Sequence, residues 1–216
     1  MKKLKTAVPA PAPQPKVMGV GGTDRSIAQL AAATHRLTMR RVRDLLPGKI
    51  ETKRLVLRAP IRGDVPDLVK LADNKAIAER LARLPSPYTR TDAVGFVEIF
   101  SQRADERPYA ITLDEHFIGV VGLSFHEGRP PELGYWLGER FWGRGFMTEA
   151  AGALVDVAQK THHYDLIAAR ALADNAGSLH VLEKLGFHRK GKAKSETAHN
   201  FGKPIVLLEL ERPRWM

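Results

Sequence analysis

The chain has 216 residues, of which 44% are hydrophobic, so it is long enough for one domain with a sizeable core and an extension. It contains no cysteine, which excludes disulfides, thiolate metal sites and a cysteine acyl-enzyme. No apolar run approaches the roughly 20 residues that a membrane span needs. Prolines at positions 9, 11, 13 and 15 interrupt any signal-peptide core, so we expect a cytoplasmic protein.

Most of the net charge of +10 lies in residues 1–50, which contain ten Lys or Arg and two Asp and so carry +8. We predict that residues 1–25, rich in Pro, Ala, Gly and Lys, are disordered. Apolar residues at helical spacing beside four arginines predict a helix over 26–46. One interpretation of this extension is a basic arm that binds RNA, the ribosome or an anionic membrane. The alternatives are a helix that packs on its own domain and a misassigned start codon. We expect the folded domain to span 51–216.

Strand and helix patterns alternate in the first half of this domain. A strand is predicted over 54–59, and a helix begins at Gly63. A short helical run over 77–84 and a helix beginning at Thr91 or Asp92 follow. Three closely spaced strands then predict an antiparallel meander, over 109–113, 117–125 and 132–137.

The second half contains two more helices and three more strands. A helix is predicted over 146–160 and an apolar strand over 164–171. The next helix, over 176–185, ends at Gly186, which can cap it. A final pair of strands, over 187–197 and 204–210, completes an α/β (α+β) fold.

The stretch from 140 to 150 joins the predicted strand 132–137 to the predicted helix 146–160 and reads Arg-Phe-Trp-Gly-Arg-Gly-Phe-Met-Thr-Glu-Ala. The first N–H groups of a helix lack intrahelical partners and carry partial positive charge. Two glycines one residue apart let the backbone approach a ligand closely. Arg140 and Arg144 add full charges, so the expected ligand is a phosphate or pyrophosphate. The alternative is a tight turn with surface arginines.

Three blocks, in order, resemble the GNAT superfamily of N-acetyltransferases. The Arg-x-x-Gly-x-Gly loop resembles the family's acetyl-CoA pyrophosphate loop, and its full version resembles the RimJ/RimL-like subgroup that acetylates N-terminal residues of ribosomal proteins. The Asn-Ala-Gly-Ser run at 175–178, followed by Lys-Leu-Gly-Phe at 184–187, resembles the family's Asn-x-x-Ser helix. Residues 51–58 resemble the subgroup's first strand. The resemblance covers about residues 51–211.

The resemblance implies the GNAT fold, a central mixed and mostly antiparallel sheet of about six to seven strands with a splayed parallel pair, flanked by helices on both faces. The splayed strands would be 132–137 and 164–171, and the pantetheine arm of acetyl-CoA would bind backbone exposed between them. Acetyl-CoA is therefore the expected cosubstrate. The implied cofactor-binding residues are Tyr135, Trp136, Leu137, Arg140, Trp142, Gly143, Arg144, Gly145, Phe146, Met147, Thr148, Asn175 and Ser178.

Acetyl transfer to an amine needs a donor for the thioester oxygen, a base for the ammonium and an acid for the leaving thiolate. The resemblance implies Glu132 as the base, sometimes through water; the alternative is an exposed strand-end carboxylate. Many members carry a tyrosine seven residues after the equivalent of Asn175 as the acid, but this chain has Leu182. Ser178 is the hydroxyl left on that helix and the implied acid. The alternatives are a first-turn serine that binds backbone, and unassisted thiolate departure.

Family members use the helices after the first strand as one wall of the acceptor cleft. This implies that Arg83, Tyr88, Arg90 and Phe96 face substrate, although each is otherwise ordinary surface or core. The histidines have no companion ligands at metal-site spacing, so we expect no metal.

The function that the resemblance implies is direct transfer of an acetyl group, in a ternary complex, to a primary amine, most simply the N-terminal α-amine of a ribosomal protein. A small amine, an amino acid or an aminoglycoside is an alternative acceptor, because one scaffold serves all of these. An alternative of another class is a non-catalytic CoA-binding or RNA-associated module that uses the extension. Glu132, Asn175 and Ser178 are polar residues at the three implied site positions. Their presence favours an enzyme over a non-catalytic module. The sequence is compatible with a monomer or a homodimer.

Overall fold

The computed structural model of the chain describes residues 33–34, 37, 40, 43–160 and 164–212. The chain divides into two compact units, residues 1–34 and 35–216, and the elements below belong to the second. The predicted disorder over 1–25 lies outside the described residues, as does most of the predicted helix over 26–46. The described residues between 33 and 44 are helical.

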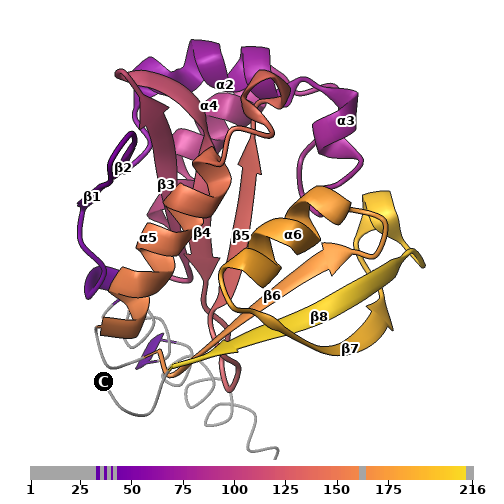
Figure 1. Cartoon of the computed structure of the whole chain (residues 1–216). Helices are drawn as coiled ribbons and strands as arrows, with labels where there is room; N and C mark the ends of the chain where they lie inside the picture. Colours follow the sequence, from indigo (N-terminus) through magenta and orange to yellow (C-terminus); the bar gives the residue numbers. More distant parts are fainter. Residues whose placement is uncertain (1–32, 35–36, 38–39, 41–42, 161–163, 213–216) are drawn as a thin grey trace, which may run out of the picture. The chain divides into compact units, whose positions relative to one another are not determined.

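Within the described residues, eight strands form one mixed sheet in the order β1-β2-β3-β4-β5-β6-β8-β7 (Figure 1). Every neighbouring pair is antiparallel except β5 and β6, which are parallel. The strands are β1 (Lys49–Glu51), β2 (Val56–Arg58), β3 (Glu106–Leu113), β4 (His116–Ser124), β5 (Glu132–Leu137), β6 (Leu166–Leu172), β7 (His188–Lys194) and β8 (Pro204–Glu211).

This architecture confirms the predicted mixed sheet with one parallel pair, but the strand count of six to seven was too low. The missed strand is β1, which pairs with β2 through Ile50 and Leu57. It is only three residues long and has one apolar side chain, so it carries no alternation that a sequence pattern can reveal.

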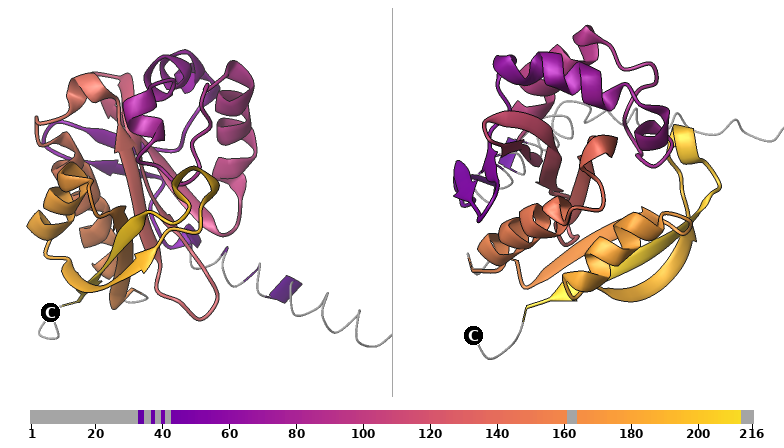
Figure 2. Two further views of the ribbon diagram at one scale, coloured as in Figure 1. Left: turned by 90° about the vertical axis from the view of Figure 1, so that its right-hand side faces the viewer. Right: turned by 45° about the horizontal axis from the view of Figure 1, so that its top comes forward.

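Helices cover both faces of the sheet (Figures 1 and 2). On one face α2 and α4 pack on Ala110 and Val120; on the other α5 and α6 pack on the larger core around Leu154 and Ile167. No helix among the described residues is both long and apolar enough to cross a bilayer. The α-helices are α2 (Val65–Ala72), α3 (Lys75–Ala78), α4 (Arg90–Glu98), α5 (Phe146–Lys160) and α6 (Ala176–Lys184), with short 3-10 turns η1 (Arg62–Asp64), η2 (Phe100–Gln102), η3 (Glu139–Phe141) and η4 (Ala198–Asn200).

The helix predicted over 77–84 is instead the single turn α3. Asn74 caps its start, and the chain leaves the helix after Ala78. The carbonyl of Leu81 accepts a hydrogen bond from Asn200 Nδ2 (3.2 Å) rather than from a helical neighbour. The proline at 85 also disfavours helical backbone in the residue before it.

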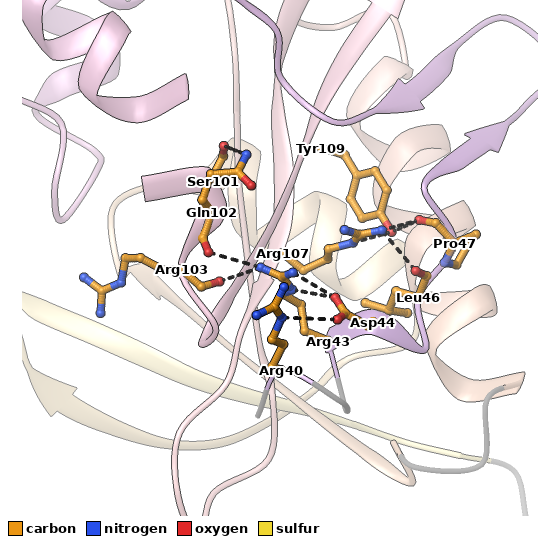
Figure 3. A network of polar contacts seen from close by, with 10 residues as sticks. All are labelled: Arg40, Arg43, Asp44, Leu46, Pro47, Ser101, Gln102, Arg103, Arg107 and Tyr109. Carbon is orange, nitrogen blue, oxygen red and sulfur yellow. Dashed lines mark hydrogen bonds and ion pairs between the residues drawn. The ribbon is translucent and has the colours of Figure 1, made fainter. Parts of the chain in front are cut away.

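The segment just before β1 is tied to the sheet by a polar network (Figure 3). Arg107 Nη2 donates to the carbonyls of Leu46 (3.0 Å) and Pro47 (2.8 Å), and the Tyr109 hydroxyl donates to Pro47 O (2.6 Å). Arg43 Nη1 donates to the Arg103 carbonyl (2.9 Å). The Leu46 side chain is 2% exposed and belongs to the main core. The predicted boundary between 50 and 51 therefore falls inside β1.

Candidate active site

The parallel strands β5 and β6 pair at two positions, Glu132 with Ala168 and Leu133 with Ala169. On its other edge β5 pairs with β4 over all six of its residues. Beyond Leu133 the two parallel strands diverge (Figure 1). The backbone of residues 134–137 thus has no strand neighbour on that edge and can hydrogen-bond an extended ligand, as an exposed sheet edge does. The predicted splayed pair is confirmed, and the opening between the diverging parts of β5 and β6 is the splay.

The loop between β5 and α5 has the conformation that its glycines favour. The backbone φ is +71° at Gly143 and +75° at Gly145, a region that glycine enters at no steric cost. Helix α5 begins directly after the loop, and its first backbone bond runs from Glu149 N to Gly145 O (3.1 Å). The first-turn donors without intrahelical acceptors are the N–H groups of Phe146, Met147 and Thr148.

Trp142 holds this loop against the end of β5. Its Nε1 donates to the Leu137 carbonyl (2.8 Å). Leu137 is one of the predicted cofactor-binding residues, and this bond occupies its backbone acceptor. The guanidinium of Arg80 lies 5.8 Å from the centroid of the Trp142 ring. Arg140, also in the predicted set, lines a surface cavity of about 420 Å3 together with Lys70, Leu71, Asn74 and Glu139.

A clamp that the sequence analysis missed fixes the first turn of α5. The Glu149 carboxylate accepts hydrogen bonds from the Thr52 hydroxyl (2.6 Å), from Arg54 N (2.8 Å) and from Arg54 Nε (2.6 Å). Arg54 Nη1 also donates to the carbonyl of Arg144 in the loop (3.1 Å). Burial raises the pKa of Glu149, but the bonds from Thr52 and Arg54 outweigh it and the net pKa is lowered. These residues are more than ninety positions apart, so no local spacing reveals the contact.

Two arginine side chains pack on the aromatic ring at the start of α5. The guanidinium carbons of Arg54 and Arg144 lie 4.5 and 4.8 Å from the centroid of the buried Phe146 ring. A cation over an aromatic face is held by the ring quadrupole. Since Arg54 is balanced by Glu149, Arg144 and the N–H groups of the first turn are the groups that favour an anionic ligand.

The start of α6, the helix that follows β6, borders the splay on the side opposite β5. Asn175 is the N-cap, and its Oδ1 accepts from Ser178 N (3.1 Å). The Tyr135 hydroxyl, which comes from β5, lies 3.0 Å from both the carbonyl oxygen and the Oγ of Ser178. Burial raises the pKa of Tyr135 to about 12. Leu182, seven residues after Asn175, is 1% exposed in the core.

Glu132 lies on the opposite face of the sheet from Tyr135, because successive strand residues alternate. It forms a two-point ion pair with Arg170, in which Nε donates to Oε1 (2.7 Å) and Nη2 to Oε2. This hydrogen bonding raises the pKa of Arg170. A cavity of about 270 Å3 adjoins the pair and is also lined by His126, Arg129, Leu207 and Glu209.

A row of polar side chains crosses three strands at Glu132. Glu106, Ser124 and Glu132 occupy paired positions on β3, β4 and β5, so their side chains share one face. Ser124 Oγ donates to Glu106 (2.7 Å), whose side chain also accepts from Arg83 Nη1 (2.9 Å). In the next row Gly134 is exposed, and a Cβ built on it would meet no atom within 4 Å. There is consequently open space beside Glu132 on this face.

The remaining acceptor-side candidates are distributed between this row and the core. Arg83 reaches the row through its bond to Glu106. Tyr88 is 5% exposed within the α2/α4 core, and Phe96 stacks on Phe100 with ring centroids 5.6 Å apart. Trp136 is one of the predicted cofactor-binding residues, but its ring packs in the same core, with its centroid 5.9 Å from that of Phe117. The backbone of Trp136 is therefore the part that faces the splay.

Comparison with known proteins gives a match over residues 54–188 to the family described as an acetyltransferase (GNAT) domain. The chain belongs to this family. A [ribosomal protein uS5]-alanine N-acetyltransferase from Escherichia coli is 38% identical over 101 residues, which are 46% of this chain and 50% of that protein. The chain spans about half the length of the curated relatives it matches.

Two solved acetyltransferase structures share the fold. One is a RimL ribosomal-protein alpha-N-acetyltransferase in complex with coenzyme A, with a TM-score of 0.67 and 22% identity, covering 76% of this chain and 97% of that one. The other is a microcin self-immunity acetyltransferase in complex with acetyl-CoA and AMP, with a TM-score of 0.69 and 22% identity, covering 78% and 98%.

Proposed function

We propose that this protein is an N-acetyltransferase that transfers the acetyl group of acetyl-CoA to a primary amine within a ternary complex. The observation that carries the proposal is the splay of β5 and β6 directly beside a glycine loop at the start of α5. Membership of the GNAT family supports it, as do the relatives whose names include N-acetyltransferase.

The residues present suit acetyl-CoA, which supplies an activated acetyl thioester when bound. The loop 140–145 and the first turn of α5 would hold the pyrophosphate through backbone N–H groups. The backbone of 134–137 would hold the pantetheine arm, and an N–H there would donate to the thioester oxygen. The Asn175 side chain caps α6 through its oxygen, which leaves its amide nitrogen as the group for the cofactor.

The acceptor would approach over Gly134, on the face that carries Glu132. We assign Glu132 as the base that takes the proton of the acceptor ammonium, directly or through a water molecule. Arg170 fixes the orientation of its carboxylate. Ser178, on the far side of the strand, would donate to the leaving sulfur. Arg83 would act at the edge of the acceptor space through Glu106.

The acceptor we favour is the N-terminal α-amine of a ribosomal protein, because the Escherichia coli relative is named for that substrate. A small-molecule amine is the alternative, favoured by the shared fold of the microcin self-immunity enzyme. A ribosomal acceptor would place the protein in the cytoplasm, and we propose that the +8 extension then contacts ribosomal RNA.

A transfer assay separates these readings. Full-length protein is incubated with acetyl-CoA and a panel of N-terminal peptides, amino acids and aminoglycosides, and free-thiol release is read together with product mass. We expect release that depends on one acceptor class, with the added mass on its primary amine. Tight CoA binding without transfer to any acceptor would instead favour the non-catalytic module.

A further inference from the structure

One side-chain contact bridges the two halves of the splay. Tyr135 comes from β5, and Ser178 comes from α6, which follows β6 along the chain. The Tyr135 hydroxyl lies 3.0 Å from both Ser178 O and Ser178 Oγ. The phenol thus reaches across the opening in which β5 and β6 no longer pair.

The protons available at this contact allow two arrangements. A carbonyl oxygen only accepts, whereas each hydroxyl has one proton to donate. In the structure Tyr135 donates to the Ser178 carbonyl, and the serine proton then points at the phenol oxygen. If Tyr135 donates to Ser178 Oγ instead, the serine proton is free to point elsewhere. The phenol therefore controls which way the serine donates.

We propose that Tyr135 is a positioning residue that turns the Ser178 hydroxyl proton toward the sulfur of the bound acyl donor. The inference rests on the proposed function, in which Ser178 donates to the leaving thiolate, and it names the residue that orients this donor. No proton leaves Tyr135: when the acyl donor binds, the phenol turns its hydrogen bond from the Ser178 carbonyl to Ser178 Oγ, and Ser178 donates one to sulfur.

Two features of the site support this division of roles. The pKa of Tyr135 is raised to about 12 by burial, so the phenol keeps its proton throughout the range in which enzymes work. Leu182 supplies no hydroxyl from α6 and is buried in the core. The hydroxyl groups placed at this end of α6 are therefore Ser178 itself and the phenol that β5 contributes.

The kinetic test uses Tyr135→Phe, Ser178→Ala and the double variant, with the acceptor in excess. If Tyr135 acts through Ser178, each single variant should lower kcat by about threefold to tenfold, the effect of one hydrogen bond. The double variant should be no slower than Ser178→Ala. All three losses should shrink with an acyl donor whose thiol is more acidic. Multiplying losses in the double variant, or full activity of Tyr135→Phe, would overturn the proposal.

A binding test needs no turnover. The ratio of the affinities for CoA and desulfo-CoA, measured by calorimetry, reports hydrogen bonding to sulfur. We expect this ratio to fall by about threefold to tenfold in Tyr135→Phe and in Ser178→Ala, with desulfo-CoA affinity unchanged. Tyr109→Phe is the matched control, since its hydroxyl binds Pro47 O far along the chain from the splay, and its ratio should equal that of the parent.

The two tests distinguish failure of the inference from failure of the proposed function. If Ser178→Ala lowers kcat and the ratio but Tyr135→Phe changes neither, the positioning role is wrong and the donor role of Ser178 stands. If Ser178→Ala changes neither quantity, both assignments are wrong. If the protein transfers no acetyl group to any acceptor, the affinity ratio still decides whether Tyr135 acts on the sulfur site.

Discussion

The Glu149 carboxylate lies in the first turn of α5, where an anionic ligand is expected, so its charge must be balanced. Arg54 does this with two hydrogen bonds, one from its backbone N–H and one from Nε, and the second is also an ion pair. Arg54→Met should weaken CoA binding by about tenfold or more, since an unpaired carboxylate would repel pyrophosphate. Arg54→Met combined with Glu149→Gln should recover most of the loss, as measured by calorimetry. Equal weakness of the single and double variants would mean that Arg54 acts on the ligand directly.

The assignment of Glu132 is tested at the same scale. General acid–base assistance is worth about 10²–10⁴ in rate, so Glu132→Gln should lower turnover by at least about 10². CoA affinity should stay unchanged, because Glu132 faces away from α6. The assay requires the true acceptor or a good surrogate. Near-normal turnover on such an acceptor would mean that the base is elsewhere, either water or Glu127.

Single residues in the loop were predictable, but their partners were not. The positive φ angles at Gly143 and Gly145 could be predicted, because few residue types other than glycine adopt them. By contrast, the contacts Arg54–Glu149, Tyr135–Ser178 and Glu106–Ser124 depend on strand register and on how a helix lies over a sheet. A sequence pattern contains neither the strand register nor the position of a helix on the sheet.

Among the elements, the strand and helix around the loop carry the strongest signals. The sequence predicted 132–137 and 146–160, and β5 and α5 have these bounds. A glycine-containing turn and long periodic runs explain the success. The strand β1 was missed and α3 was predicted too long, because three or four residues contain little more than one period of a strand or helix pattern.

The junction between β5 and α5 gives the element-scale prediction. Gly143→Val and Gly145→Val should lower CoA affinity by orders of magnitude, since a side chain would lie where the pyrophosphate is expected, and a β-branched residue strains the positive φ. Both variants should stay folded, because a Cβ at Gly143 meets no atom within 4 Å and one at Gly145 meets Arg54 Nη2 at 3.6 Å. Calorimetry with CoA and a melting curve measure the two effects. Unchanged CoA affinity in both variants would defeat the pyrophosphate assignment.

At the scale of the whole molecule, the end of the N-terminal segment is part of the folded core. Leu46 and Ile50 are 2% and 7% exposed in the main cluster, and large-to-small changes at such positions cost about 2–5 kcal/mol each. Deletion of residues 1–51 should therefore lower the melting temperature by roughly 10 °C or more. Deletion of residues 1–42 keeps these two side chains and should change the melting temperature little. Equal melting temperatures of the two truncations would contradict the packing of this segment.

The shorter truncation also isolates the charge of the extension, because residues 1–42 contain eight Lys or Arg and one Asp. If they bind ribosomal RNA, the full-length protein should bind RNA at low salt and lose affinity steeply as salt is raised, since bound phosphates release counterions. The protein without residues 1–42 should lose this binding and still acetylate a short peptide at the parent rate, because the splay, the loop and Glu132 all lie beyond residue 50. Filter binding over a salt series and the peptide assay measure the two properties. Absence of RNA binding by the full-length chain at low salt would leave the extension without this role.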